Sequence, residues 1–384
     1  MNARVCVGPV LMCFLAACGG GASDIDEGDV ANGIGVLGNE NHTVSGVLLS
    51  VVADSSDDIE EPMDVEFNPV VPGQAWVVSR SDERLLIIDG IGTAEQDITD
   101  FDVDRHFLAQ PIGLAFSDDG YMASIHDTDQ PTQGAATPAD FMGPTLWPAT
   151  IDDCETPSNA QAGSLEDETW CFAANHMSHL DMLHNSPLGG GIEWEEGNTY
   201  WVMDGDHGSL TRYRFNDDHG PGGTDHTDGE IQRFVNGDLD RNFDLPSQMV
   251  LDHATGLLYV ADTGNSRIMS LDTNAGTQGN NVGPNYDGCP QYKMDDVSLQ
   301  PFLTADNAAL GHPSGMALHD GVLYVTDSMT SILYAYDLVG NELDWVDLGR
   351  GEGALAGIDV DPATGDLYIA DREAAEILRL QNPG

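Results

Sequence analysis

The chain repeats one structural unit along most of its length, and the clearest copy spans residues 246–272. This copy opens with Pro246 and contains three short apolar runs, at residues 249–251, 257–261 and 267–271. Turns rich in Gly, Asn, Asp and Ser separate the runs, and apolar residues that alternate between such turns predict antiparallel β-strands. A sheet of this size cannot bury both of its faces alone, so we expect the copies to pack against one another.

Five further segments show the same pattern, with more variation in the first two. They lie at residues 65–89, 111–127, 190–215, 313–337 and 356–380. Six copies at a spacing of roughly 40 to 65 residues, with three or four strands each, are typical of a β-propeller. We therefore expect an all-β fold, a six-bladed β-propeller over residues 44–384.

The two ends of the repeated region complement each other. The last copy, at residues 356–380, shows three strands before the sequence reaches Gly384, whereas a β-prone run at residues 47–53 precedes the first copy. We expect this early run to supply the outer strand of the last blade. Such pairing would close the ring and remove its exposed sheet edges.

Three short motifs recur among the copies. They are a Pro-x-Gly-apolar turn at residues 313–316, a Leu-Tyr-Val-x-Asp strand at residues 323–327, and an Asp-Thr-Gly-Asn-Ser-Arg-Ile turn at residues 262–268. Together they resemble NHL repeats, and the resemblance covers about residues 65–380. It implies a six-bladed propeller, but it leaves the function open because this fold carries lyases, lactonase-like enzymes, adhesion modules and scaffolds.

The first 18 residues have the pattern of an export signal. Arg4 supplies a positive charge, residues 5–14 are apolar, and Leu15-Ala16-Ala17-Cys18 resembles a bacterial lipobox, which implies lipidation of Cys18. Residues 19–43 are rich in Gly, Asp and Glu and predict a flexible acidic tether. We expect an exported lipoprotein of the outer membrane, facing the periplasm or the cell surface, that contacts the membrane through its lipid. The alternative is an ordinary signal peptide that happens to carry a cysteine.

The composition is strongly acidic. The sequence holds 65 acidic and 13 basic residues, a formal net charge of −52, and its single lysine is Lys293. This charge repels nucleic acid, which we exclude as a partner, and bound cations or salt would relieve the repulsion within the folded chain. Calcium is one cation that the sequence admits; simple solubility in a saline habitat is the alternative explanation. We expect a monomer.

Residues 128–186 interrupt the repeat after the second strand of the second copy. We expect this segment to form a cap over one face of the ring, stiffened by a Cys154–Cys171 disulfide in an oxidising compartment, with an extra structural hairpin as the alternative. The segment contains the His-rich run of residues 175–184. The sequence leaves the state of Cys289 open.

Loops after the second strands emerge on the same face of a propeller as the connections between blades. We expect a site there for zinc, another transition metal or calcium, because carboxylates and neutral imidazoles converge. The predicted metal ligands are His126, Asp127, His184, Asp204, Asp206 and His207. Arg80 and His207 are the candidate catalytic residues. On the opposite face, the loop at residues 216–230 is rich in Asp, His and Gly but lacks the spacing of an EF-hand. We interpret it as a solvated acidic loop.

Two enzyme families of this fold provide templates. Arg80 matches the position of a catalytic arginine in peptidylglycine amidating lyases, but Ile112, Ser247 and Ser314 stand where that resemblance implies zinc histidines. Ile112 also replaces a calcium-ligating Asn of gluconolactonase-type enzymes. The leading hypothesis is therefore a lipid-anchored cell-envelope module that binds a metal or a protein, glycan or small-molecule ligand. The alternative is a metal-dependent hydrolase or lyase with an Asp/His pocket under the cap.

Overall fold

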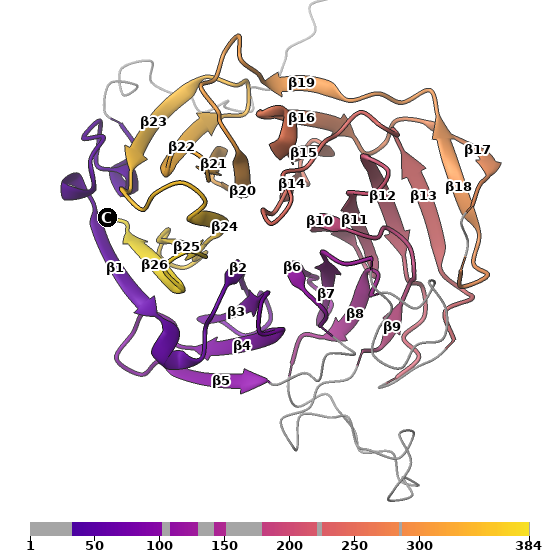
Figure 1. Ribbon diagram of the computed structural model, residues 1–384, viewed down its shortest axis with the longest axis horizontal. Helices are drawn as coiled ribbons and strands as arrows, with labels where there is room; N and C mark the ends of the chain where they lie inside the picture. Colours follow the sequence, from indigo (N-terminus) through magenta and orange to yellow (C-terminus); the bar gives the residue numbers. More distant parts are fainter. Residues whose placement is uncertain are drawn as a thin grey trace, which may run out of the picture. The chain divides into compact units, whose positions relative to one another are not determined.

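The computed structural model describes residues 33–101, 108–129, 142–150, 179–220, 225–283 and 286–383. From Gly33 onward the chain forms one compact unit. Six sheets stand around a common axis, with one inner strand of each sheet nearest the axis (Figure 1). The predicted all-β six-bladed propeller is confirmed.

The blades follow one another along the chain, and each is described from its inner strand outward. The first contains β2 (Pro62–Phe67), β3 (Gln74–Ser79), β4 (Arg84–Asp89) and β5 (Asp97–Phe101). The second contains β6 (Pro111–Phe116), β7 (Tyr121–His126), β8 (Thr145–Pro148) and β9 (Asp181–Met182). The third begins with β10 (Gly189–Glu196), β11 (Thr199–Asp204), β12 (Ser209–Arg214) and β13 (Glu230–Phe234).

The remaining blades have the same order. The fourth contains β14 (Met249–Asp252), β15 (Leu257–Asp262), β16 (Arg267–Asp272) and β19 (Gln300–Leu303). The fifth contains β20 (Pro313–His319), β21 (Val322–Asp327), β22 (Ile332–Asp337) and β23 (Glu342–Asp347). The sixth contains β24 (Leu355–Val360), β25 (Leu367–Asp371), β26 (Glu376–Gln381) and β1 (Leu48–Ala53).

The sixth blade joins the two ends of the folded unit. β1 pairs antiparallel with β26, with Ser50 opposite Arg379. The prediction that residues 47–53 close the ring is therefore confirmed, with the strand beginning at Leu48. The pairing covers the edge that β26 would otherwise expose.

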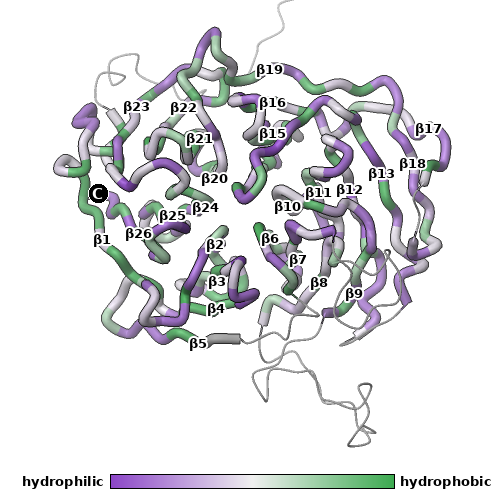
Figure 2. Tube along the Cα trace, viewed as in Figure 1, coloured by the Kyte–Doolittle hydropathy of each residue, from purple (hydrophilic) through white to green (hydrophobic). Residues whose placement is uncertain are grey.

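The core lies between neighbouring blades. Most strands carry hydrophobic residues (Figure 2), and the buried side chains pack from one blade onto the next. Trp76 and Trp201 are fully buried examples in the first and third blades. The pattern follows from the two-residue period of a strand, which directs alternate side chains to opposite faces of its sheet.

The third blade is wider than the sequence pattern predicts. A hairpin of β17 (Thr277–Asn281) and β18 (Gln291–Asp295) lies in the sequence between two strands of the fourth blade. It pairs instead with the third blade, where β18 runs parallel to β13 with Ile231 opposite Gln291. The loop between β17 and β18 therefore lies beside the outer strands of the second and third blades.

The N-terminal boundary also differs from the expectation. Val36 and Leu37 are buried among core residues of the fifth and sixth blades. The His42 ring stacks on Trp345 with ring centroids 4.0 Å apart. Residues 33–43 of the predicted tether thus belong to the folded unit, whereas Cys18 and the rest of the tether lie outside the described residues. No helix in the described part of the chain is long and apolar enough to cross a membrane.

Strands β8 and β9 fall within the range predicted as a cap insertion. They are the third and fourth strands of the second blade, so residues 128–186 are not one separate insertion. Residues 151–178, which lie between these two strands in the sequence, are outside the described residues. Cys154 and Cys171 lie outside the described residues, and the structure shows no disulfide within them. Cys289 is buried and takes part in no disulfide among the described residues.

Candidate metal centre

A cluster of imidazole and carboxylate groups lies at the outer rim, where the second and third blades meet. Its residues come from three parts of the chain: the neighbourhood of β9, the connection between β12 and β13, and the loop between β17 and β18. We call it the rim cluster, and it consists of His179, Asp181, His184, His219, His226, Asp228 and Asp287.

Asp181 is the most deeply buried member of the rim cluster. Its side chain has no exposed area, and its Oδ1 accepts the backbone N–H of Met182 at 2.7 Å. The Nδ1 atom of His226 also lies 2.7 Å from Oδ1. Oδ2 is buried and has no hydrogen-bond partner among the described residues. Burial raises the pKa of Asp181, and the unpaired oxygen needs either a proton or a cation.

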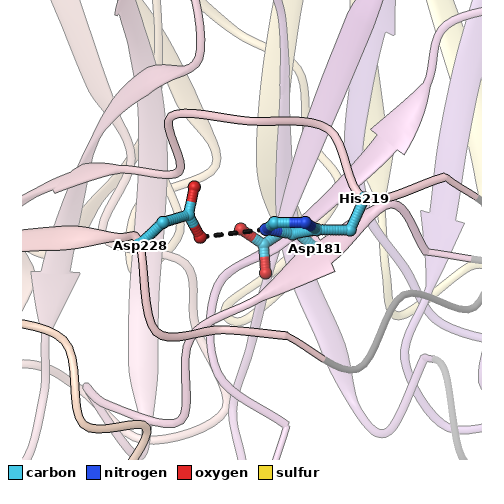
Figure 3. A group of neighbouring side chains, drawn as sticks. All are labelled: Asp181, His219 and Asp228. Atoms are coloured by element: carbon cyan, nitrogen blue, oxygen red, sulfur yellow. Dashed lines mark hydrogen bonds and ion pairs between the residues drawn. The ribbon is translucent and has the colours of Figure 1, made fainter.

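His219 and Asp228 face Asp181 from the connection between β12 and β13. The His219 Nε2 atom lies 2.9 Å from Asp228 Oδ1, and this hydrogen bond raises the pKa of His219. The backbone N–H of His219 donates to the Leu180 carbonyl at 3.3 Å, which ties the loop to the second blade. One ligand atom from each of Asp181, His219 and Asp228 lies within 4.8 Å of the other two (Figure 3).

Local sequence holds this loop in shape. Asn216 adopts a left-handed backbone conformation with φ 61°, which Asn tolerates better than most residues. Its Nδ2 donates to the Asp228 carbonyl at 2.6 Å, and the backbone N–H of Asp217 donates to Asp228 Oδ2 at 3.1 Å. The two arms of the loop are thereby joined, and Asp228 is positioned beside His219.

The three facing side chains suit a transition metal. Zinc takes imidazole nitrogen and carboxylate oxygen at about 2.0–2.2 Å, so its tetrahedral ligands lie roughly 3.4 Å apart. The three ligand atoms lie within 4.8 Å of one another, so a metal ion would have to draw them closer by up to about 1.4 Å. Calcium prefers six to eight oxygen ligands, which the described residues of this cluster do not supply.

His184 is the one predicted metal ligand that lies in the rim cluster. Its Nδ1 atom is 2.7 Å from Asp287 Oδ1, and its backbone N–H donates to Asp287 Oδ2 at 2.7 Å. The partner comes from the β17–β18 loop, far along the sequence.

His126, another predicted ligand, is fully buried within the second blade. Its Nε2 lies 3.1 Å from Ser124 Oγ, and its Nδ1 lies 3.1 Å from the Gly143 carbonyl. Burial lowers the pKa of His126 to about 4. The ring is therefore neutral and has both nitrogens engaged within the blade.

Asp204, Asp206 and His207 lie together after the second strand of the third blade. The His207 Nδ1 atom is 3.0 Å from Asp204 Oδ2 and 3.6 Å from Asp206 Oδ2. Asp204 is fully buried and also accepts the Ser186 hydroxyl at 3.0 Å. The six predicted metal ligands thus do not form one site, because these three lie together and His126 and His184 lie elsewhere.

Arg80 and Asp127 belong to a charged network on the same face as His207. Arg80 Nη2 lies 3.0 Å from Asp127 Oδ2 and 2.9 Å from Asp244 Oδ1. On its other side Asp127 pairs with Arg241, whose side chain is 1% exposed, at 2.8 Å. The Arg80 guanidinium is therefore already paired with carboxylates, whereas a catalytic arginine that binds an anionic substrate is expected to be unpaired before the substrate binds.

Sequence reasoning missed Asp181, His219, Asp228 and Asp287 as site residues. The loop at residues 216–230 was interpreted as solvated, because nothing in its spacing matches a known metal motif. The usable signal was the density of histidines between residues 176 and 226. The contact of Asp287 with His184 depends on the hairpin of β17 and β18 pairing with the third blade, which the sequence pattern does not reveal.

Comparison with known proteins identifies the fold. No family model matches the chain, and no curated protein matches its sequence. A structural genomics protein of unknown function from Bacteroides thetaiotaomicron is similar, with a TM-score of 0.56 at 13% identity over 87% of this chain and 75% of the other.

Two further solved structures are similar over a comparable share of this chain. An auxiliary nutrient binding protein from Bacteroides thetaiotaomicron gives a TM-score of 0.51 at 10% identity over 84% of this chain and 69% of the other. The calcium-binding protein regucalcin from Agrobacterium tumefaciens gives a TM-score of 0.51 at 11% identity over 87% and 93%. At such low identity the similarity shows the propeller fold. Membership of the NHL-repeat family stays a prediction.

Proposed function

We propose that this protein is an exported metal-binding β-propeller that holds a transition-metal ion, with zinc as the best fit, at Asp181, His219 and Asp228. The observation that carries the proposal is the buried Asp181 Oδ2 atom, which has no hydrogen-bond partner in the described part of the chain. A cation bound there would satisfy this oxygen and use the imidazole that faces it.

Charge favours a metal ion over a proton. The rim cluster contains three carboxylates, from Asp181, Asp228 and Asp287, and its described residues include no lysine or arginine. A divalent ion neutralises two of these negative charges, whereas a proton on Asp181 neutralises one. The imidazole of His219 selects zinc or a similar metal over calcium.

The setting of this propeller is part of the proposal. The export signal, the lipidation of Cys18 and an outer-membrane location rest on the sequence of residues 1–18. In that setting the protein would act as a binding module for a protein, glycan or small molecule, stabilised by its metal. An auxiliary nutrient binding protein among the similar structures is consistent with such a role.

A hydrolase or lyase is the second candidate function. It is favoured by the pairing of His207 with the buried Asp204, because a carboxylate on Nδ1 orients an imidazole and leaves Nε2 for a proton transfer. The His207 side chain is 22% exposed, so a substrate on that face would reach it. Loss of activity in His207→Ala, with binding of metal unchanged, would distinguish this function from the first.

The proposal is tested by the metal content of the full chain purified without chelator. We expect at least one equivalent of zinc per chain, and zinc should raise the melting temperature of the wild type. The double variant His219→Ala/Asp228→Asn should lose one equivalent of zinc and the stabilisation that this ion provides. His207→Ala is the matched control, because it removes an imidazole that is also held by an aspartate but lies outside the rim cluster. A wild-type protein that binds no transition metal at micromolar concentrations would overturn the proposal.

A further inference from the structure

The other imidazoles of the rim cluster are arranged as ligands in their own right. We infer that His184 and His226 bind a second divalent transition-metal ion beside the first. This inference rests on the proposed function, because it makes the rim cluster a centre for two metal ions. It depends, however, on different residues and different observations.

Both imidazoles are oriented by carboxylates. His184 Nδ1 lies 2.7 Å from Asp287 Oδ1, and His226 Nδ1 lies 2.7 Å from Asp181 Oδ1. A carboxylate on one ring nitrogen fixes the tautomer and directs the other nitrogen, Nε2, toward a metal. Within the described residues neither Nε2 atom makes a hydrogen bond. Each ring therefore has its donor nitrogen engaged and its acceptor nitrogen available.

The spacing of the two rings fits one shared ion. Their centroids are 5.5 Å apart and their planes are inclined by 67°. A zinc–nitrogen bond of about 2.0–2.1 Å places each ring centroid roughly 3.2 Å from the metal, so two imidazoles at a tetrahedral angle have centroids about 5 Å apart. The observed separation is close to this value before any metal is bound.

A third imidazole lies next to this pair. The His179 ring centroid is 6.3 Å from that of His226, and the residue is 7% exposed. His179 is therefore the candidate for a third ligand of the same ion. Three histidines are a common ligand set for zinc, with the fourth position left to water or a ligand.

Asp181 connects the two proposed positions. One of its carboxylate oxygens lies near His219 and Asp228, and its Oδ1 holds His226. An ion at the first position draws electron density from the Asp181 carboxylate, and this carboxylate also orients His226 at the second position. We therefore expect the two ions to bind with coupled affinities rather than independently.

The test is the zinc stoichiometry of the full chain, measured by elemental analysis after equilibrium dialysis against zinc alone. We expect two equivalents for the wild type and for the His207→Ala control. The double variants His184→Ala/His226→Ala and His219→Ala/Asp228→Asn should each retain one. Thermal unfolding of every variant checks that the propeller is intact.

The outcomes separate the two proposals. Two equivalents retained by His184→Ala/His226→Ala would overturn the second position, and so would one equivalent in the wild type that disappears only in His219→Ala/Asp228→Asn. The latter result would leave the proposed function standing. No zinc in the wild type would overturn both proposals.

A milder variant addresses the orientation argument without removing a ligand. Asp287→Asn keeps the shape of the side chain but weakens its hold on His184. Replacement of such outer partners typically costs about 10–100-fold in metal affinity. We expect that loss at the second position, with the affinity of the first position changed much less. Unchanged affinity for both ions would count against His184 as a ligand.

Discussion

The carboxyl group of Asp64 shows how strongly this propeller buries charge near its axis. Asp64 lies on β2 and is 1% exposed. Its Oδ2 accepts the backbone N–H of Leu114 at 2.9 Å, which joins the first blade to the second. Burial raises the pKa of Asp64 to about 8, from 3.8 in an exposed carboxyl. Glu193 and Asp359 also have raised pKa values, mainly because of burial.

The Asp64 pKa predicts a pH dependence of stability. The folded protein retains the Asp64 proton up to about pH 8, whereas the unfolded chain releases it near 3.8. The stabilisation is complete below the unfolded pKa and is lost as pH rises through this window. Urea denaturation between about pH 5 and pH 8 should show a falling free energy of unfolding in the wild type and a flatter profile in Asp64→Asn. Parallel profiles would contradict this assignment.

Cys289 gives a second prediction for a single residue. The thiol is fully buried, and burial with the nearby Asp287 charge raises its pKa to about 12. Since the thiolate is the reactive form, Cys289 should not react with a disulfide reagent such as dithionitrobenzoate in the folded protein. Unfolding in urea should expose it. Cys289→Ser is the control that assigns the signal, and rapid labelling of the native chain would refute the prediction.

The strand β1 stabilises the sixth blade in two ways. It contributes Ala53 and the partly buried Leu49 and Val52 to the core. Burial of such side chains is worth about 1.5–3 kcal/mol for each large one. The same strand covers the edge of β26.

Deletion of β1 should therefore weaken and expose the sixth blade. We expect removal of residues 1–54, which takes away the buried Val36 and Leu37 together with β1, to lower the free energy of unfolding by roughly 3–5 kcal/mol and to promote self-association through β26. Removal of residues 1–32 is the matched control and should leave both properties unchanged. Chemical denaturation and analytical ultracentrifugation measure the two effects. Equal stability of the two truncated proteins would show that β1 does not close the ring.

The elements that sequence analysis found and missed differ in their apolar content. The blades at residues 246–272 and 313–337 were found because their strands are apolar runs, buried along most of their length, between turns rich in Gly, Asn and Asp. The strand β17 is almost entirely exposed, so it leaves no apolar pattern. The strand β9 has two residues, too few to show a period. Because the rim cluster is built on these two inconspicuous regions, its residues were recognised as polar but not as neighbours.

The charge of the whole molecule has its own consequence. With 65 acidic and 13 basic residues, the folded chain repels itself in dilute buffer. At 0.1 M salt the repulsion between exposed charges more than about 10 Å apart is largely screened. The melting temperature should therefore rise with added sodium chloride. Calcium chloride at equal ionic strength is the comparison that separates screening from specific binding. A melting temperature that is independent of salt would contradict this prediction.

The pairing of β1 with β26 also affects when the molecule can become native. The two strands come from opposite ends of the folded unit. During synthesis or export, β1 emerges first and has no partner until the last residues of the unit have followed. For the exported protein that residues 1–18 predict, the ring could not close while part of the chain was still inside a translocation channel. Such a chain would stay competent for transport until its final strand is released, and its folding would be completed on the far side of the membrane.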